Sequence, residues 1–290
     1  MSYQDLVLGL KIDVDTFRGM KEGVPRLMEI LARLEIKGSF FLSMGPDASG
    51  LAIFQLIKNP RFWKKMLRSR ATELYGWKTA LYGTLIPSPL IALSFPEQVR
   101  SLIAEGHEVA LHAWDHRRWQ DTLPRRDEGW IRTWFEKGIG AFKSLTGRPP
   151  RAFGAPGWVM DERALAVVCT LMPVDYLSCT RAQEPFLYRD FGVLELPSDL
   201  PCIEEVGSEG VREKLREMHE KGGVHILPVH AEVEGGVWST QFEALLKEVL
   251  SLQGKITTLE EIANLIDKKS LPIRIPILSV IPGRASPCLV

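Results

Sequence analysis

Two histidines four residues apart, His112 and His116, follow an apolar run near the middle of the chain. At this spacing both imidazoles can turn a ring nitrogen toward a single metal ion. A carboxylate from another strand end would complete a two-histidine, one-carboxylate site that leaves coordination positions open for water and substrate. The pattern favours metal-assisted hydrolysis, although a surface pair beside a helix start would have the same spacing.

Asp13 and Asp15, close to the start of the chain, are the candidates for that carboxylate. They lie two residues apart at the end of an apolar run, so a strand places both side chains on one face. Two carboxylates in an apolar strand are costly unless a metal ion or protons compensate their charge. They could instead cap the following turn, but the coincidence of both patterns at predicted strand ends favours a shared metal site.

A further histidine, His230, stands at the end of another apolar run. An imidazole titrates near neutral pH, so His230 could donate a proton to a leaving group. Glu232 shares its face of the chain and could orient the ring. The alternative is a buried histidine bonded to the backbone, and a structural role is what we expect for the other three histidines, His107, His219 and His225.

A segment rich in glycine and proline, residues 153–158, ends in the aromatic residue Trp158. Glycine permits backbone angles that other residues avoid, so the segment could be only a tight strand-to-helix turn. It could equally form a wall of the site that presents backbone N–H groups and the side chains of Pro156 and Trp158 to a substrate.

Short apolar runs alternate with helical patterns, which predicts parallel strands with helices outside them. We expect strands at 6–14, 38–42, 107–111, 152–155, 176–179, 193–196, 224–229 and 256–258, and helices at 24–34, 96–105, 130–145, 162–171, 211–221 and 240–252. Seven or eight strands in 290 residues favour an α/β fold with a distorted (β/α) barrel over an open sheet. We assign residues 1–268 to the barrel domain, 46–94 to an insertion within it, and 269–290 to a C-terminal tail.

The insertion combines bases with aromatic residues. Between residues 51 and 93 a single acid, Glu73, accompanies the bases Lys58, Arg61, Lys64, Lys65, Arg68, Arg70 and Lys78 and the aromatics Phe54, Phe62, Trp63, Tyr75, Trp77 and Tyr82. Each base near an anionic leaflet contributes about 1 kcal/mol of attraction, and aromatic rings suit the interface. The composition predicts docking to a membrane surface through residues 51–93; a solvated helical pair packed on the barrel is the alternative.

Overall composition limits the class of protein. Lys plus Arg and Asp plus Glu both number 36, which argues against nucleic acid as a partner. The four cysteines form no C-x-x-C pair, so a reducing cytosol is the simplest compartment. No basic leader and no span of about 20 apolar residues is present. We expect a cytoplasmic protein, peripherally associated with the inner face of the bacterial inner membrane, of undetermined oligomeric state.

At this point the motifs resemble those of the polysaccharide deacetylase (NodB-homology) family, over residues 6–258. The resemblance implies a distorted barrel and an amide hydrolase that uses one divalent ion, whether zinc, manganese or cobalt. It also implies a role for each motif residue: Asp13 as catalytic base, His230 as general acid, and Asp15, His112 and His116 as metal ligands.

Longer strings, at residues 11–19, 45–47, 74–77, 106–116 and 230–236, are similar to one branch of the family. That branch removes a formyl group from 4-deoxy-4-formamido-L-arabinose carried on undecaprenyl phosphate, in the aminoarabinose modification of lipid A. The resemblance implies this lipid-linked aminosugar as substrate. The alternatives are an N-deacetylase of another sugar, a catalytically weak glycolipid-binding protein and, from the ligand set alone, an iron oxygenase.

Two positions depart from the family pattern. An arginine is expected early in the third motif, where this chain has Gly154 or Ala155, and an aspartate in the fourth, where it has Cys179. These residues normally orient the catalytic base, and Arg181 or Arg151 could substitute for them. The expected substrate contacts are Trp158, Pro156, Arg181 and Glu232.

Overall fold

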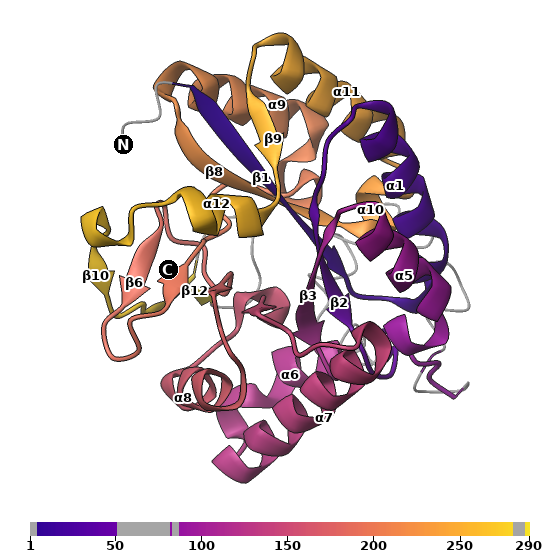
Figure 1. Cartoon of the computed structure of the whole chain (residues 1–290), viewed down its shortest axis with the longest axis vertical. Coiled ribbons are helices and arrows are strands. Elements are labelled where there is room, and N and C mark those ends of the chain that lie inside the picture. Colours follow the sequence, from indigo (N-terminus) through magenta and orange to yellow (C-terminus); the bar gives the residue numbers. More distant parts are fainter. Residues whose placement is uncertain (1–4, 51–81, 83–86, 281–287) are drawn as a thin grey trace.

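The computed structural model describes residues 5–50, 82, 87–280 and 288–290, and most of the predicted insertion lies outside them. Its centre is a curled sheet whose strands run in the order β10-β6-β7-β5-β4-β3-β2-β1-β8, with β9 also paired to β1 (Figure 1). The bounds are β1 (Leu6–Val14), β2 (Ser39–Ser43), β3 (Glu108–Ala113), β4 (Ala152–Phe153), β5 (Tyr176–Leu177), β6 (Phe186–Tyr188), β7 (Leu194–Glu195), β8 (Gly223–His230), β9 (Lys255–Thr257) and β10 (Ile273–Arg274).

Strand β1 is the organising element, because it pairs in parallel with three others. β8 runs beside its whole length, while β9 pairs with residues 7–9 and β2 with residues 11–14 of the opposite edge. The antiparallel β6–β7 pair is the exception in the described sheet. The chain after β7 then reaches β8, where the carboxylate of Asp199 accepts the N–H of Ile226 at 2.7 Å. The sheet therefore curls into a distorted barrel. Between β7 and β8 the barrel is closed by the side chain of Asp199 and its loop instead of by strand pairing.

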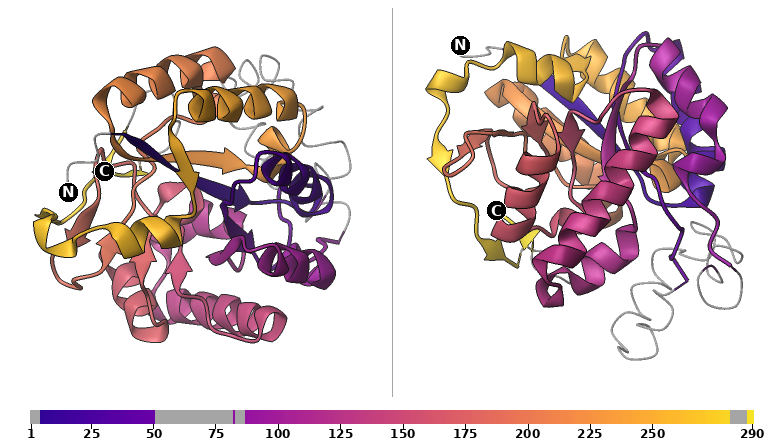
Figure 2. Two further views of the ribbon diagram at one scale, coloured as in Figure 1. Left: turned by 45° about the horizontal axis from the view of Figure 1, so that its top comes forward. Right: turned by 60° about the horizontal axis from the view of Figure 1, so that its bottom comes forward.

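Helices surround this sheet, most of them on its outer face (Figure 2). They are α1 (Val24–Arg33), α5 (Pro96–Ala104), α6 (His116–Thr122), α7 (Glu128–Thr146), α8 (Glu162–Leu171), α9 (Ile203–Lys221), α10 (Ala231–Glu234), α11 (Ser239–Ser251) and α12 (Leu259–Leu265), with a π-helical turn (Gly19–Gly23) before α1. Side-chain caps begin several of them. Asp127 accepts the N–H of Trp130 at the start of α7, and Asp161 accepts that of Ala164 at the start of α8.

Two apolar cores hold the layers together. The larger lies between the sheet and the outer helices, and the smaller fills the inside of the curl. Helix α12 closes the amino end of the inner core with Leu259 and Ile262. A side chain at Gly9 would collide with both of them and with Ile226, so the glycine makes room for this plug. The carboxyl ends of the strands are therefore the open end, where barrel enzymes place their chemistry.

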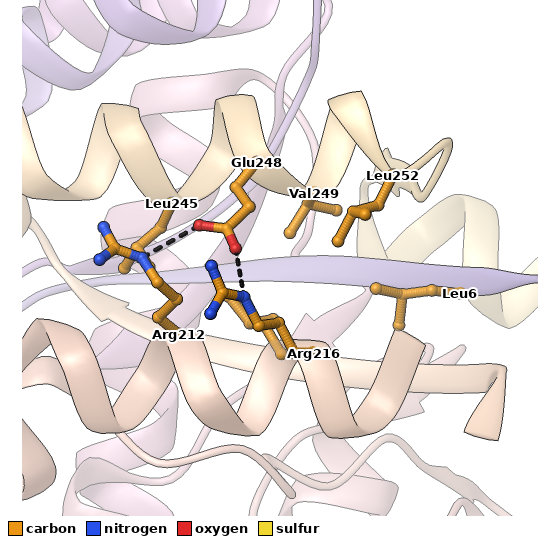
Figure 3. Close-up of a pocket in the computed structure, with 8 residues that line it drawn as sticks. Leu6, Arg212, Arg216, Leu245, Glu248, Val249 and Leu252 are labelled. Atoms are coloured by element: carbon orange, nitrogen blue, oxygen red, sulfur yellow. Dashed lines mark hydrogen bonds and ion pairs between the residues drawn. The ribbon is translucent and has the colours of Figure 1, made fainter. Parts of the chain in front are cut away.

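Helices α9 and α11 pack against each other at the opposite, amino end (Figure 3). The Glu248 carboxylate bridges Arg212 at 3.0 Å and Arg216 at 2.6 Å, above an apolar floor that includes Leu6 and Leu245. Leu6 is the first residue of β1, and the predicted catalytic base Asp13 stands near its other end. These ion pairs and the apolar floor hold α9 and α11 together.

The prediction of an α/β distorted barrel is confirmed, and each of the eight predicted strands has a counterpart. The sheet has ten described strands rather than seven or eight, because β6 and β10 add an edge to it. The predicted tail supplies β10, followed by the strand pair β11 (Leu278–Ser279) and β12 (Cys288–Leu289). The division into domains stays a prediction. No helix among the described residues is long and apolar enough to cross a membrane.

Candidate metal centre and active site

The three residues predicted to bind a metal ion converge at the carboxyl end of the sheet. Nε2 of His112 lies 3.1 Å from Oδ1 of Asp15, and Nε2 of His116 lies 3.3 Å from Oδ2 of the same carboxylate. One ligand atom from each residue lies within 4.8 Å of the other two. The three side chains are therefore close enough to share one ion.

Different local elements place each of these side chains. Asp15 directly follows β1, and His112 lies near the end of β3. His116 is the first residue of α6, whose start is capped by Asp115 accepting the N–H of Arg118 at 3.0 Å. The four-residue spacing thus crosses from a strand into a helix, and that change of direction turns both rings toward Asp15.

Unpaired atoms in this group fit a cation. Nδ1 of His112 lies 2.8 Å from the carbonyl oxygen of Gly154, which can only accept, so Nδ1 carries a proton. In the neutral ring Nε2 then presents a lone pair to Oδ1 of Asp15, and both atoms are buried without a hydrogen-bond partner among the described residues. Two acceptors at this separation repel unless a positive charge lies between them. Two imidazoles and a carboxylate suit zinc, manganese or cobalt.

The ionisation states of these candidate ligands also fit a bound cation. Burial opposes the charge on Asp15, but the imidazoles of His116 and His112 hold the pKa of this carboxyl well below its usual range. Burial lowers the pKa of His116 to about 4, so its ring is neutral at neutral pH. A carboxylate and a neutral imidazole are the forms in which these side chains bind metals.

Asp13, the predicted catalytic base, is buried beside the ligands. Its carboxylate accepts hydrogen bonds from Nζ of Lys11 at 2.7 and 2.5 Å, and Oδ1 lies 3.9 Å from Nδ1 of His112. In the parallel pairing of β1 with β8, Asp13 stands opposite His230. Partners in register project to the same face of a sheet, so the predicted base and acid share one end of two neighbouring strands.

His230 is held by acidic neighbours. Its Nδ1 lies 3.1 Å from Oε2 of Glu204, and its backbone N–H donates to Glu234 at 2.7 Å. Burial alone would lower the pKa of the imidazole, but the charge of Glu204 and side-chain hydrogen bonds with Cys202 and Glu204 raise it well above its usual value. A raised pKa favours the protonated ring, which is the form that a general acid needs.

Glu232, predicted to orient His230 and to contact substrate, is buried at the same end of the sheet. Burial and the nearby charge of Asp15 raise the pKa of its carboxyl. Its Oε2 would lie 2.5 Å from a Cβ at position 19, so Gly19 allows this close approach. Glu204 takes the place beside the imidazole that we had expected for Glu232, and Oε2 of Glu232 has no hydrogen-bond partner in the described part of the chain.

The turn after β4 forms a buried corner of the site. Gly157 and Trp158 both have left-handed backbone angles, with φ of 60° and 56°, and Pro156 precedes them. The guanidinium carbon of Arg181 lies 4.8 Å from the centre of the Trp158 ring, and its nitrogens bind Glu205 at 3.1 Å. Arg181 therefore supports this corner from within the protein.

Lys11 and Asp47 were not singled out from the sequence. Neither expected substitute for the family arginine approaches Asp13, because Arg181 binds Glu205 and Arg151 pairs with Asp175 at the surface. Lys11 makes that contact instead. Its position two residues before Asp13, on the same strand face, was the signal available.

Asp47 joins the loops after β1 and β2. Its carboxylate accepts the N–H of Phe17 at 2.8 Å and that of Ser49 at 3.0 Å, and burial raises its pKa. Asp47 lies in the short string, residues 45–47, that resembled the formamido-sugar branch of the family. Its contacts fix the loop that begins just beyond Asp15.

Comparisons with known proteins agree with this geometry. The family profile described as polysaccharide deacetylase matches residues 10–171. A protein of Shewanella sediminis (strain HAW-EB3), named probable 4-deoxy-4-formamido-L-arabinose-phosphoundecaprenol deformylase ArnD, is 35% identical over 253 residues, or 85% of this chain and 82% of the relative. A protein of Wigglesworthia glossinidia brevipalpis with the same name is 30% identical over 238 residues, or 79% and 82%.

Solved structures share the fold. A putative polysaccharide deacetylase from Mycobacterium smegmatis matches with a TM-score of 0.67 at 18% identity over 96% of each chain. The allantoinase PuuE matches with a TM-score of 0.65 at 13% identity over 90% of each chain. At such low identities the likeness establishes the architecture alone.

A curled α/β barrel with an Asp-His-His cluster at its open end defines a hydrolase able to hold a divalent ion. The chain belongs to the polysaccharide deacetylase family, and it is an amide hydrolase of that family.

Proposed function

We propose that this protein is a divalent-metal-dependent deformylase that acts on 4-deoxy-4-formamido-L-arabinose carried on undecaprenyl phosphate, in lipid A aminoarabinose modification. Two relatives named for this activity align with 79–85% of the chain. The observation that carries the chemistry is the convergence of Asp15, His112 and His116 beside buried Asp13, which stands opposite His230.

A divalent ion held by Asp15, His112 and His116 would polarise the formyl carbonyl and make a water easier to deprotonate. Asp13 accepts a proton from the attacking water, whose oxygen forms the new bond to the formyl carbon. The buried position of Asp13 keeps bulk water from competing for its oxygens.

His230 acts on the leaving nitrogen of the amide, whereas Asp13 acts on the attacking water. The C–N bond breaks as the imidazolium donates its proton to the departing nitrogen, which leaves as the free amine of the sugar. The formyl carbon leaves as formate. The proton taken by Asp13 then returns to solvent and His230 is reprotonated, so one water is consumed per amide bond.

Substrate contacts are proposed at the corner of the site. We propose that Pro156 and Trp158, which Arg181 supports, contact the substrate, and that Oε2 of Glu232, which has no hydrogen-bond partner among the described residues, accepts the N–H of the formamide.

A lipid-linked substrate requires access to a membrane surface. We propose that residues 51–93, with their seven bases and interleaved aromatics, dock the protein on the cytoplasmic face of the bacterial inner membrane. Co-sedimentation with anionic liposomes tests this proposal. Binding that persists after deletion of residues 51–90 would contradict it.

The assay for the proposed reaction compares two synthetic lipid substrates that differ only in the acyl group. Purified protein loaded with manganese, zinc or cobalt should release formate from the formamido sugar lipid, and a chelator should stop the release. Acetate release from the acetamido analogue at an equal or greater rate would assign the protein as an N-deacetylase. Failure to hydrolyse either amide would favour a glycolipid-binding role.

A further inference from the structure

We propose that Lys11 is a positioning residue for the catalytic base Asp13, and that Gly154 is glycine because any side chain there would displace Lys11. The inference rests on the proposed hydrolytic function of the Asp13 site. It concerns a residue of the strand that carries Asp13 and leads directly to Asp15.

The contact between Lys11 and Asp13 is short and fully enclosed. Nζ of Lys11 lies 2.7 and 2.5 Å from the two carboxylate oxygens, and the lysine side chain is 0% exposed. A lysine is seldom buried to this extent unless its charge is compensated. Asp13 is the one acidic partner within ion-pair distance of its ammonium among the described residues.

Aromatic rings confine the ammonium group. Nζ lies 5.0 Å from the centre of the Phe41 ring and 5.4 Å from that of Trp158. Both distances are within the range of cation–π attraction. The lysine is thus held from three sides, and its rigid ammonium holds the carboxylate of Asp13 in one orientation.

The space around Gly154 explains why the positive side chain beside Asp13 comes from β1. A Cβ at Gly154 would lie 3.0 Å from Cε of Lys11 and 2.8 Å from the Phe41 ring. The backbone angles of Gly154 are not left-handed, so a larger residue is excluded by the lysine and the ring and not by strain. A cationic side chain from position 154 and Lys11 would therefore compete for one space, and this chain uses Lys11.

Fixing Asp13 has a chemical consequence. Asp13 and Asp15 lie on the same face of the chain, so an unrestrained Asp13 could turn toward the metal ligands instead of toward water. Both its oxygens contact the Lys11 ammonium, which keeps the carboxylate in one orientation beside the site. The contacts of the Lys11 ammonium among the described residues are with Asp13 and two aromatic rings, not with Asp15, His112 or His116, so Lys11 acts through Asp13.

The test compares Lys11→Met, which keeps the length and apolar contacts, with Lys11→Arg, which keeps the charge. Lys11→Met should retain one metal per chain and a KM within about threefold, while kcat falls about 100-fold, as expected for a misplaced catalytic group. Lys11→Arg should recover at least part of that loss. Wild-type kcat in Lys11→Met, or equal losses in both variants, would overturn the proposal.

Moving the positive side chain from position 11 to position 154 provides a sharper test. Gly154→Arg alone should lose activity because its side chain collides with Lys11 and with the Phe41 ring, whereas Lys11→Ala/Gly154→Arg, which removes the first of these collisions, should exceed both single variants in kcat. A double variant that is no better than the single ones would contradict the shared space. All rates are measured on whichever amide the wild type hydrolyses, formyl or acetyl.

Unfolding experiments keep the inference testable if the wild type hydrolyses neither amide, a result that would reject only the proposed function. Lys11→Met leaves a buried charge on Asp13, so it should lower the urea midpoint strongly in the wild-type background. The same change in an Asp13→Asn background should lower it much less. Equal shifts in the two backgrounds would show that the pair is not coupled and would overturn the proposal.

Discussion

Nδ1 of His112 donates to the carbonyl oxygen of Gly154 at 2.8 Å, which ties a metal-ligand candidate to the backbone after β4. The bond fixes which ring nitrogen carries the proton and leaves Nε2 facing Asp15. Because the acceptor is a main-chain carbonyl, the orientation of His112 depends on the position of that turn. The glycine that admits Lys11 also supplies this carbonyl, so one residue supports both the predicted base and a ligand.

Asp15→Asn should abolish metal retention. The amide keeps the shape of the carboxylate but removes the charge that attracts the ion, and we expect affinity to fall by more than about 100-fold, the upper range for losing an outer-shell partner. Elemental analysis after dialysis measures the change. Asp175→Asn, which alters a surface aspartate paired with Arg151, is the matched control and should keep its metal. A full metal complement in Asp15→Asn would remove this residue from the ligand set.

His230→Asn should separate metal binding from turnover. The variant lacks the protonated ring, so kcat should fall by about 100-fold to 10,000-fold, the usual contribution of a general acid. Its metal content should match that of the wild type, because His230 is not among the three converging ligands. His219→Asn, at the far end of α9 near the start of β8, is the control. Wild-type kcat in His230→Asn would exclude the assigned role.

Much of the barrel could be predicted because its strands are long or strongly apolar. Strand β1 is buried throughout, β8 is buried over residues 226–229, and both are rich in Val, Leu and Ile, the pattern of buried parallel strands. The three-residue β6 and the seven-residue α6, with only Trp119 buried, carry too little periodicity to be recognised. Their place is set by tertiary packing.

The convergence of Asp15, His112 and His116 could be predicted for a related reason. Alternation along β1 puts Asp13 and Asp15 on one face, and the carboxyl ends of parallel strands meet at one edge. The residues that contact Asp13 and His230, in contrast, could not be predicted from the sequence. Glu204 approaches His230 from a helix 26 residues earlier in the chain, and the importance of Lys11 emerges only when Gly154 lies across from it. Such contacts depend on packing between elements, which no local pattern encodes.

Glu195→Gln should change how stability depends on pH. Burial raises the pKa of Glu195 to about 7, although it accepts hydrogen bonds from Tyr188 and from the backbone of Cys179 and Thr180. Between its unfolded value of 4.5 and about 7, only the unfolded chain releases this proton, so the wild type loses stability as pH rises. Below about pH 4.5, ionisation of Glu195 does not change the free energy of unfolding. Above about pH 7, the loss of unfolding free energy no longer varies with pH.

Glutamine cannot ionise and can still accept both backbone N–H groups. Relative to the wild type, Glu195→Gln should therefore gain about 2–3 kcal/mol of unfolding free energy between about pH 5 and pH 8. Urea unfolding at both pH values provides the measurement. Parallel pH dependence of the two proteins would show that Glu195 titrates alike in the folded and unfolded states.

Gly45→Ala should disturb the metal site through the backbone. A Cβ there would lie 2.0 Å from the carbonyl oxygen of Trp114, midway between the two histidine ligands, so the segment that carries His116 must move. We expect about 1–3 kcal/mol of lost stability, typical of overpacking, together with weaker metal binding. Gly140→Ala, where nothing lies within 4 Å of the added Cβ on the exposed side of α7, should instead stabilise by up to about 1 kcal/mol. Thermal unfolding and metal titration of both variants check this pair, and unchanged metal affinity in Gly45→Ala would show that the Trp114 carbonyl does not set the position of His116.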